Sequence, residues 1–353
     1  MTDTEHLASD TTHPADPGVD AAATEATDRT QRPGPPQVDF PPVRNGIDYL
    51  TSVIELLDAT QPSARDLKYA VLHLQAATEV LLKARLQAEH WSLIFTEPLN
   101  ATREKFTSGD FVSCTVEETI DRLQQLADVR FEPKHLRAIK NLTQDRNKLQ
   151  HYGLTHNALA IEGRAAEVLH FLLDFVHLDL SRHIDREEWE RMDIKLSMVR
   201  RGLGRMGKFV TTRMNDLRDE IAEVADHIVQ CPDCDQWAAI VLHGSRCAFC
   251  HQVHDPAAFA ASWYQRAREE IQGKDWTYQN DCPDCWAERA FIGPVFFESA
   301  RDQPRFACFH CQFTAATALC TRCARPFPAI GSRSECGTCM PPSPAVPTPR
   351  SGP

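Results

Sequence analysis

The sequence has 353 residues, of which 42% are hydrophobic and 25% charged, a composition typical of a globular protein with about two or three domains. Its formal net charge of −11 argues against a generally basic, polyanion-binding surface. No apolar stretch approaches the roughly 18 residues that would cross a bilayer, and the first residues lack the basic start and apolar run of a signal peptide. We therefore expect a soluble, cytoplasmic protein with no membrane partner.

The two ends of the chain have compositions that predict disorder. Residues 1–43 contain eight acidic and two basic residues, many Thr, Ala and Pro, and few side chains that could form a core. Residues 342–353 are rich in Pro and Ser. We therefore expect a disordered acidic tail before the first domain and a second disordered tail after the last.

A helical apolar period runs through residues 44–184 and predicts a bundle of about five helices, so we expect a mainly α fold. Ser63 with Asp66, and Thr115 with Glu118, have the spacing of a capping box at a helix start. Gly153 is a typical left-handed helix stop. The expected helices begin near Gly46, Ser63, Thr115, Pro133 and Asn157.

The fourth of these helices ends in the sequence Arg146-Asn147-Lys148-Leu149-Gln150-His151. The bare spacing of this arginine and histidine is weak evidence, because the chain contains it five times. Only this copy has an asparagine directly after the arginine, an aliphatic residue shortly before the histidine and an aromatic residue directly after it. In this helical context it resembles the Arg-Asn-x-x-x-His motif of the HEPN superfamily of helical ribonucleases. The resemblance covers the predicted bundle and leaves the rest of the chain unaccounted for.

The resemblance implies a homodimer in which two such motifs meet across a two-fold cleft, and it implies metal-independent cleavage of RNA to 2′,3′-cyclic phosphate ends. In that chemistry His151 would move protons, Arg146 would hold the developing phosphorane charge, and Asn147 would orient the phosphate or the imidazole. Asn147 and His151 share a helix face, whereas Arg146 lies about 140° from His151 and would have to reach around the helix.

Two alternatives remain open for this segment. In the first, Arg146 caps carbonyls at the helix end, Asn147 is solvated and His151 packs beside Tyr152, with no chemical role. In the second, the fold is correct but the protein does not cleave RNA. The chain would then be a dimeric binding protein whose C-terminal modules dock nucleic acid or a protein partner.

Residues 185–229 continue the helical pattern, with apolar residues at spacings of three and four. We expect a helical stalk that joins the bundle to the cysteine-rich region and could associate with a second copy. Gly202, Gly204 and Gly207 weaken its middle. Its basic residues are interpreted as a solvated helix face, with nucleic-acid contact as the alternative. They are Arg200, Arg201, Arg205, Lys208 and Arg213.

Twelve of the thirteen cysteines form six C-x-x-C pairs, and only Cys114 stands alone. Two such pairs can present four thiolates to one tetrahedral ion, so we predict three structural Zn²⁺ sites of four cysteines each. These define zinc ribbons over residues 230–254, 281–312 and 318–341, with a helical spacer over residues 255–280. The ligands, taken in order along the chain, are Cys231, Cys234, Cys247 and Cys250; Cys282, Cys285, Cys308 and Cys311; and Cys320, Cys323, Cys336 and Cys339.

Three alternatives to zinc at consecutive pairs remain open. Disulfides would require an oxidising compartment, iron could occupy the same four thiolates, and the last four pairs could interleave around two ions. The nearby histidines are not included among the ligands, because four thiolates already complete each site. They are His243, His251, His254 and His310. A closed four-thiolate site leaves no open coordination position, so any catalysis is expected in the helical half.

Overall fold

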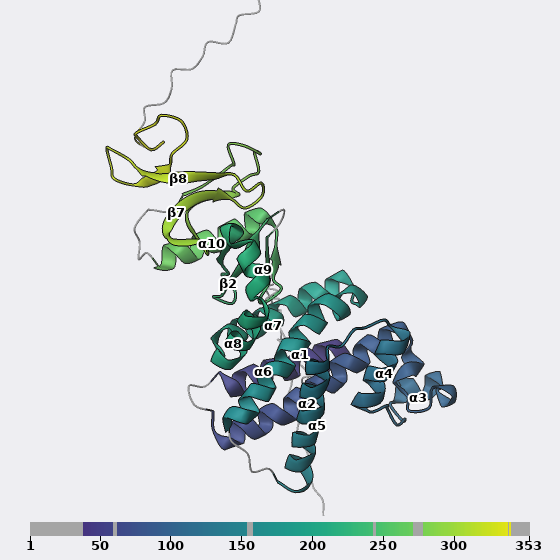
Figure 1. The fold of residues 1–353 in the computed structure, drawn as a ribbon. Helices are drawn as coiled ribbons and strands as arrows, with labels where there is room; N and C mark the ends of the chain where they lie inside the picture. The colour runs from purple at the N-terminus through teal and green to yellow at the C-terminus, as the bar shows by residue number, and fades with distance from the viewer. Residues whose placement is uncertain are drawn as a thin grey trace, which may run out of the picture. The chain divides into compact units, whose positions relative to one another are not determined.

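A computed structural model describes residues 38–58, 62–153, 158–242, 245–270, 278–337 and 339 (Figure 1). The predicted C-terminal tail lies outside them. The predicted N-terminal tail lies outside them up to residue 37, while Pro42 and Val43 already belong to the first helix.

Helices dominate the fold, as predicted, and two small sheets follow them. The helices are α1 (Pro42–Leu57), α2 (Ala64–Glu89), α3 (Arg103–Ser108), α4 (Val116–Leu126), α5 (Pro133–His151), α6 (Ala158–Asp174), α7 (Arg186–Arg205), α8 (Gly207–Asp216), α9 (Arg218–Glu223) and α10 (Pro256–Glu270). Among the described residues, no helix combines the length and the apolar character that crossing a membrane requires.

The capping signals lie where the sequence predicts them. Ser63 and Asp66 form a reciprocal capping box at the start of α2, and Thr115 and Glu118 form another at the start of α4. Each box satisfies two backbone N–H groups that have no partner inside the helix. Gly153 has a φ of +89° just after α5 and donates its N–H to the Lys148 carbonyl.

The fifth expected helix is not regular over its whole length. It is α-helical through Asp174 and then widens into a π-helical segment, Phe175–Leu180, before a 3₁₀ turn. The His177 ring lies 2.9 Å, by its Nδ1 atom, from the Leu173 carbonyl and so competes for an acceptor of the helical ladder. The short helix α3, which the sequence analysis did not predict, lies between the second and third expected helices.

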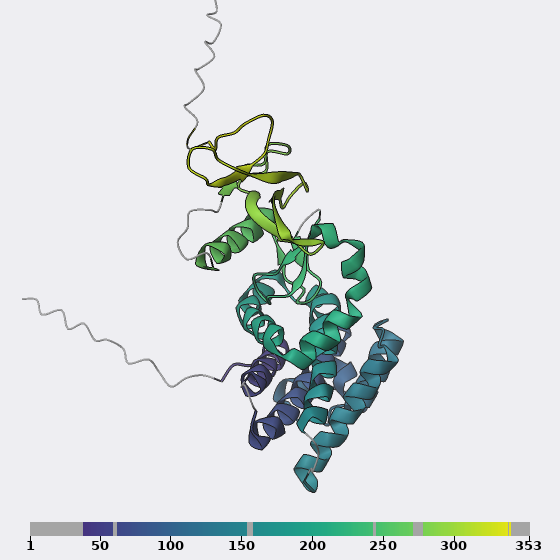
Figure 2. The same cartoon turned by 60° about the vertical axis from the view of Figure 1, so that its left-hand side comes forward.

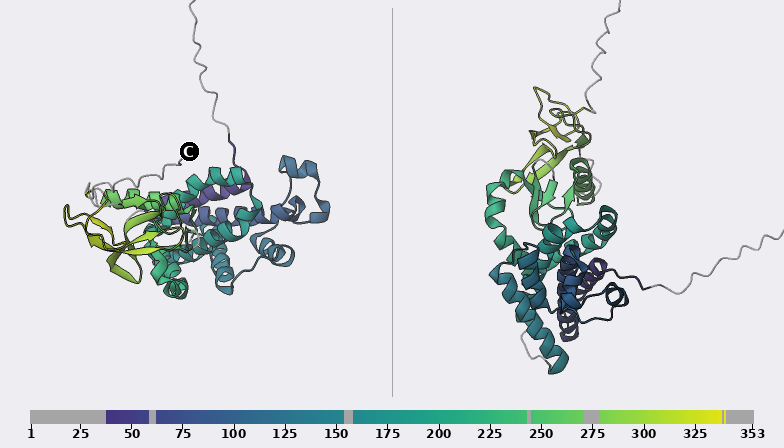
Figure 3. Two further views of the ribbon diagram at one scale, coloured as in Figure 1. Left: turned by 90° about the horizontal axis from the view of Figure 1, so that it is seen from above. Right: turned by 90° about the vertical axis from the view of Figure 1, so that its right-hand side faces the viewer.

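The prediction of a stalk over residues 185–229 requires correction, because α7 packs lengthwise against α1 and α8 packs against α6 (Figures 1 and 3). The apolar residues that would have allowed self-association are buried within the chain. They include Met192, Leu196, Val199 and Leu203. Ion pairs also join α7 to α1, with Lys195 Nζ 2.6 Å from Asp48 Oδ1 and Arg44 Nη2 3.1 Å from Glu188 Oε2.

The cysteine-rich region forms two antiparallel sheets. The first has four strands in chain order: β1 (Ile228–Gln230), β2 (Trp237–Val241), β3 (Ser245–Cys247) and β4 (Val253–His254). The second has five, also in chain order: β5 (Tyr278–Asn280), β6 (Phe291–Phe297), β7 (Ala300–Cys308), β8 (Thr314–Leu319) and β9 (Pro326–Pro328). Because β8 pairs with both β7 and β9, the second and third predicted ribbons share one sheet. Helix α10 lies beside β5 and β6 (Figure 2).

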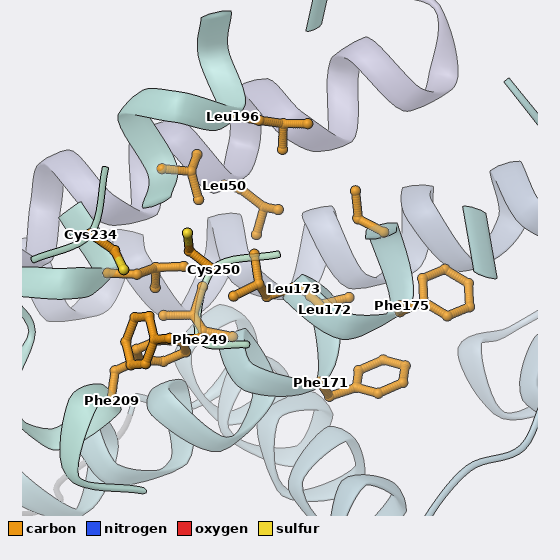
Figure 4. Packing of buried hydrophobic residues seen from close by; sticks show 14 of the residues in the cluster. Leu50, Phe171, Leu172, Leu173, Phe175, Leu196, Phe209, Cys234, Phe249 and Cys250 are labelled. Atoms are coloured by element: carbon orange, nitrogen blue, oxygen red, sulfur yellow. The ribbon is translucent and has the colours of Figure 1, made fainter. Parts of the chain in front are cut away.

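One hydrophobic core continues from the helices into the first sheet. Phe209 of α8 and Phe249, between two cysteines of the first cluster, contact each other edge to face with their ring centroids 5.4 Å apart (Figure 4). Leu172 and Leu173 of α6 lie in the same cluster of buried residues. The packing therefore makes the first cysteine cluster part of the main core.

Two glycines near the end of α7 provide a test of this packing. A Cβ atom at Gly204 would lie 2.1 Å from the carbonyl oxygen of Cys234, whereas one at Gly207 would meet nothing within 4 Å. We expect Gly204→Ala to lower the free energy of unfolding by about 1–3 kcal/mol, because backbone must move to relieve the clash. The matched Gly207→Ala should be neutral or stabilising by up to about 1 kcal/mol. Denaturant unfolding monitored by circular dichroism measures both, and equal stabilities for the two variants would contradict the packing.

Candidate functional site

The twelve paired cysteines converge into three groups of four, and each group could hold one metal ion. Within each group the sulfur atoms all lie within 4.8 Å of one another. The groups combine consecutive C-x-x-C pairs, as the sequence predicts, and the interleaved alternative is not observed among the described residues. We call them centre 1 (Cys231, Cys234, Cys247, Cys250), centre 2 (Cys282, Cys285, Cys308, Cys311) and centre 3 (Cys320, Cys323, Cys336, Cys339).

The sulfur positions fit a tetrahedral metal site. Five sulfur pairs lie between 3.6 and 3.9 Å apart. A tetrahedron of sulfurs at the usual Zn–S distance of about 2.3 Å has edges of about 3.8 Å. A disulfide would require about 2.05 Å, and all thirteen cysteines are free thiols, so the disulfide alternative is wrong for this structure.

Five C-x-x-C pairs share one backbone turn; the residue that follows the sixth pair lies outside the described ranges. In each, the residue after the second cysteine has a positive φ and donates its N–H to the carbonyl of the first cysteine, at 2.8 to 3.2 Å. These residues are Asp235, His251, Trp286, Gln312 and Ala324. None is a glycine, so this repeated left-handed position was not evident from the sequence. The turn also explains why His251 lies next to centre 1 without being counted as a ligand.

Burial differs sharply among the three centres. All four cysteines are buried in centre 1, two are half-buried in centre 2, and in centre 3 Cys323 is exposed and Cys339 half-buried. Burial raises the pKa of the Cys234 and Cys247 thiols well above the ordinary value, so a cation is needed to hold them as thiolates. Centre 1 is therefore the least accessible to water, and centre 3 the most accessible.

The buried guanidinium of Arg213 connects centre 1 to the helical domain. Arg213 is 1% exposed, and it donates to the carbonyls of Ala248 and Phe249, the two residues between Cys247 and Cys250. Its Nη2 also lies 2.8 Å from Asp174 Oδ1, at the end of α6. Sequence reasoning placed Arg213 on a solvated helix face, which is wrong for this residue and for Arg200, also 1% exposed.

Arg213, Asp174, His170 and His251 form a junction between the helices and centre 1, and Asp174 is its acidic residue. Burial alone would raise the pKa of its carboxyl, but hydrogen bonds from His170 and His251 and the charge of Arg213 lower the pKa below its ordinary value. His170 contacts Asp174 through Nε2 and Asp216 through Nδ1, at 3.2 and 3.3 Å. The junction therefore holds its buried cation with a compensating anion.

The residues of the Arg-Asn-x-x-x-His motif lie together at the C-terminal end of α5. His151 is the last residue of the helix and is exposed, and so is Asn147, one turn earlier. The half-buried Arg146 donates from Nη1 to Asn147 Oδ1 at 2.9 Å. Asn147 and His151 share a helix face, so this hydrogen bond joins the guanidinium to a residue on the side of the helix that carries the imidazole. The rings of His151 and Tyr152 have centroids 6.1 Å apart, and both side chains are exposed.

The other copies of the Arg-x4-His spacing have different surroundings. Arg85 is 5% exposed and pairs with Glu89, and His135 is 9% exposed in the core beside Phe171. His251 belongs to the junction with Asp174. Of the five copies, all of which lie within the described ranges, only the motif at the end of α5 leaves both its histidine and a following aromatic residue open to solvent.

Comparisons with protein-family models, with curated proteins and with solved structures found no match.

The unequal burial of the three centres predicts the order of metal loss. We expect zinc-loaded protein exposed to a chelator to release its ions first from centre 3, then from centre 2 and last from centre 1, because ligand exposure limits access. A colorimetric zinc assay measures the phases. The double variant Cys323→Ser, Cys339→Ser should bind one equivalent fewer and lose the fastest phase, and a fastest phase that persisted would contradict this order.

The Arg213 contacts predict a large stability effect. Arg213→Met should lower the free energy of unfolding by about 3–5 kcal/mol, because Asp174 and the carbonyls of Ala248 and Phe249 lose their buried partner. It should also accelerate zinc release from centre 1. Lys208→Met, an exposed position on the same helix, is the matched control and should change stability by less than about 0.5 kcal/mol. Equal unfolding midpoints for the two variants would contradict the proposed role of Arg213.

Proposed function

We propose that this protein is a HEPN-like, metal-independent endoribonuclease whose C-terminal half consists of zinc-stabilised adaptor modules. The observation that carries the proposal is the exposed His151 at the end of α5, with Asn147 on the same face and the Arg146 guanidinium bonded to Asn147. An accessible imidazole beside a guanidinium is the minimum equipment for moving a proton and stabilising a phosphorane.

We assign the three centres to Zn²⁺. Four thiolates at tetrahedral spacing are the ligand set of a structural zinc site, and such a site contributes directly to folding. Zinc suits the small cores around centres 2 and 3, where few other buried side chains are available. Because four thiolates fill the coordination shell, the proposed reaction is carried by the α5 residues.

The proposed reaction needs no additional reactant. The 2′-oxygen of a ribose forms a bond to the adjacent phosphorus, and the bond from that phosphorus to the 5′-oxygen breaks, leaving a 2′,3′-cyclic phosphate and a free 5′-hydroxyl. One proton leaves the 2′-hydroxyl and one reaches the 5′-oxygen. In the proposal, His151 moves these protons, Arg146 stabilises the negative equatorial oxygens, and Asn147 orients them.

A single imidazole would have to act first as the general base toward the 2′-hydroxyl and then as the general acid toward the 5′-oxygen. A second copy of the chain would supply a second imidazole, so that each role has its own residue. We therefore propose that the active form is a homodimer in which two motifs face one cleft. The exposed positions of His151 and Tyr152 at a helix end are compatible with such a contact.

A second candidate function is a non-catalytic binding protein. It is favoured by Trp286, which is 77% exposed on the turn that follows Cys285 of centre 2. An exposed tryptophan on a rigid turn could anchor a protein or nucleic-acid partner. Phe291, Phe297 and Phe306 of the same sheet are buried in its core and are not available to a partner.

The test uses the full chain purified with its zinc and assayed on end-labelled RNA in magnesium-free buffer. We expect fragments that end in 2′,3′-cyclic phosphate, and we expect His151→Ala to reduce their rate of formation by about 10²–10⁴-fold. His90→Ala is the matched control, because His90 is exposed and has the same spacing from an arginine, yet lies outside the motif.

The readouts must separate chemistry from folding. Circular dichroism, zinc content and molecular mass in solution should be the same for the wild type, His151→Ala and His90→Ala. Intact RNA with folded wild-type protein would overturn the ribonuclease and support the binding module. Equal cleavage by wild type and His151→Ala would remove His151 from the reaction.

A further inference from the structure

Helix α5 presents one continuous polar face to solvent. Six exposed residues on it fall within an arc of about 100° when each residue is rotated by 100°. The buried residues of the helix lie on the opposite side, centred on Ala138, Ile139 and Leu142. We call the exposed set the α5 stripe; its members are Arg137, Lys140, Asn141, Gln144, Lys148 and His151.

The stripe carries positive charge without compensating negative charge. The single acidic residue of α5 is Asp145, which is 4% exposed and pairs with Arg164 of α6 at 3.0 Å. Within the part of the chain that the structure describes, none of Arg137, Lys140 and Lys148 forms an ion pair. Lys134, at the start of the helix, is excluded from the stripe because it pairs with Asp216 and Glu132.

This concentration of cations stands out in a chain with a net charge of −11. The stripe extends from Arg137 to His151, about 21 Å along the helix axis at 1.5 Å per residue. At its end the aromatic ring of Tyr152 is 91% exposed. Between the cations lie Asn141 and Gln144, whose amides can both donate and accept hydrogen bonds.

We propose that the α5 stripe binds the backbone of single-stranded RNA and leads the strand to His151. Lys and Arg neutralise phosphates, the two amides are suited to ribose 2′-hydroxyls, and the exposed Tyr152 ring offers a stacking surface for a base. A single row of side chains on one helix matches one strand, whereas a duplex presents two. The inference rests on the proposed ribonuclease function and names the surface that holds its substrate.

The experiment measures binding separately from cleavage. The full chain carrying His151→Ala is titrated against a fluorescein-labelled, single-stranded oligouridylate, and fluorescence anisotropy is followed over a series of salt concentrations. In this background we add Arg137→Ala, Lys140→Ala and Lys148→Ala together. Loss of three phosphate contacts should reduce the slope of log affinity against log salt by about 2, and weaken binding about 100-fold at 0.1 M salt.

A matched control removes the same amount of charge elsewhere. Lys105→Ala, Arg201→Ala and Lys208→Ala together replace three exposed cations outside α5, and should leave affinity and salt slope nearly unchanged. Circular dichroism and zinc content verify that both triple variants are folded. Asn141 and Gln144 predict, in addition, that the 2′-deoxy oligonucleotide of the same sequence binds more weakly.

Each outcome decides the inference. It is overturned if the oligouridylate does not bind, if both triple variants lose affinity equally, or if duplex RNA binds the stripe more tightly than the single strand. Suppose that only the α5 stripe variant has a lower affinity for RNA and that the wild-type protein binds RNA without cutting it. The proposed RNA-binding role of the stripe then stands, and the ribonuclease proposal fails. If cleavage depends on His151 but not on Arg137, Lys140 and Lys148, the ribonuclease proposal stands and the proposed role of the α5 stripe fails.

Discussion

The guanidinium of Arg213 is the contact on which the continuity of this structure depends. It extends from α8 to the carbonyls between Cys247 and Cys250, and its charge is balanced by Asp174 at the end of α6. A buried cation is tolerated only when its hydrogen bonds and its charge are satisfied, so these three elements must keep their positions together. Centre 1 is consequently built into the core of the helical domain, so its four cysteines are positioned by the same contacts that hold α6 and α8.

The apolar core around the three centres becomes smaller along the chain. The main core contains the buried side chains of the helices together with those of centre 1, whereas the buried core around centre 3 consists of Cys320, Phe327 and Cys336. So small an apolar core cannot offset the conformational entropy of ordering the chain. At centre 3 the ligands themselves form most of the core, while centre 1 is supported by protein packing on several sides.

Helix α5 separates two roles on its two faces. Its inner face is fixed by apolar residues, by the Asp145 pair with Arg164 and by Thr143, whose hydroxyl donates to Gln75 Oε1 of α2 at 3.2 Å. These contacts position the helix without using any residue of the exposed stripe. The motif residues at its end are therefore held by a rigid element while remaining accessible, which is the arrangement that a proposed RNA site requires.

Features that depend on residues close together in the chain could be predicted from the amino-acid sequence. The spacing of the cysteines predicted sites of four cysteines and favoured consecutive pairs, because two short turns joined by a hairpin can bring such pairs together. It left open an interleaved arrangement of the last four pairs, and the structure groups consecutive pairs at all three centres. The starts of α2 and α4 followed from Ser63 and Thr115, because a capping box is satisfied within one helical turn.

Which surfaces pack against each other could not be predicted from the sequence. The apolar period of α7 predicted a buried face, but it could not show whether that face packs against a second copy or against α1 of the same chain. The sequence around Gly204 also gave no indication that the carbonyl of Cys234 lies against this glycine. Likewise, Arg213 looked like one member of an exposed basic cluster until the fold placed Asp174 and the Phe249 carbonyl beside it. A local sequence pattern indicates which kinds of contact a residue can make. Whether the residue is buried, and which residue it contacts, depends on segments far apart in the chain, and local spacing carries no information about them.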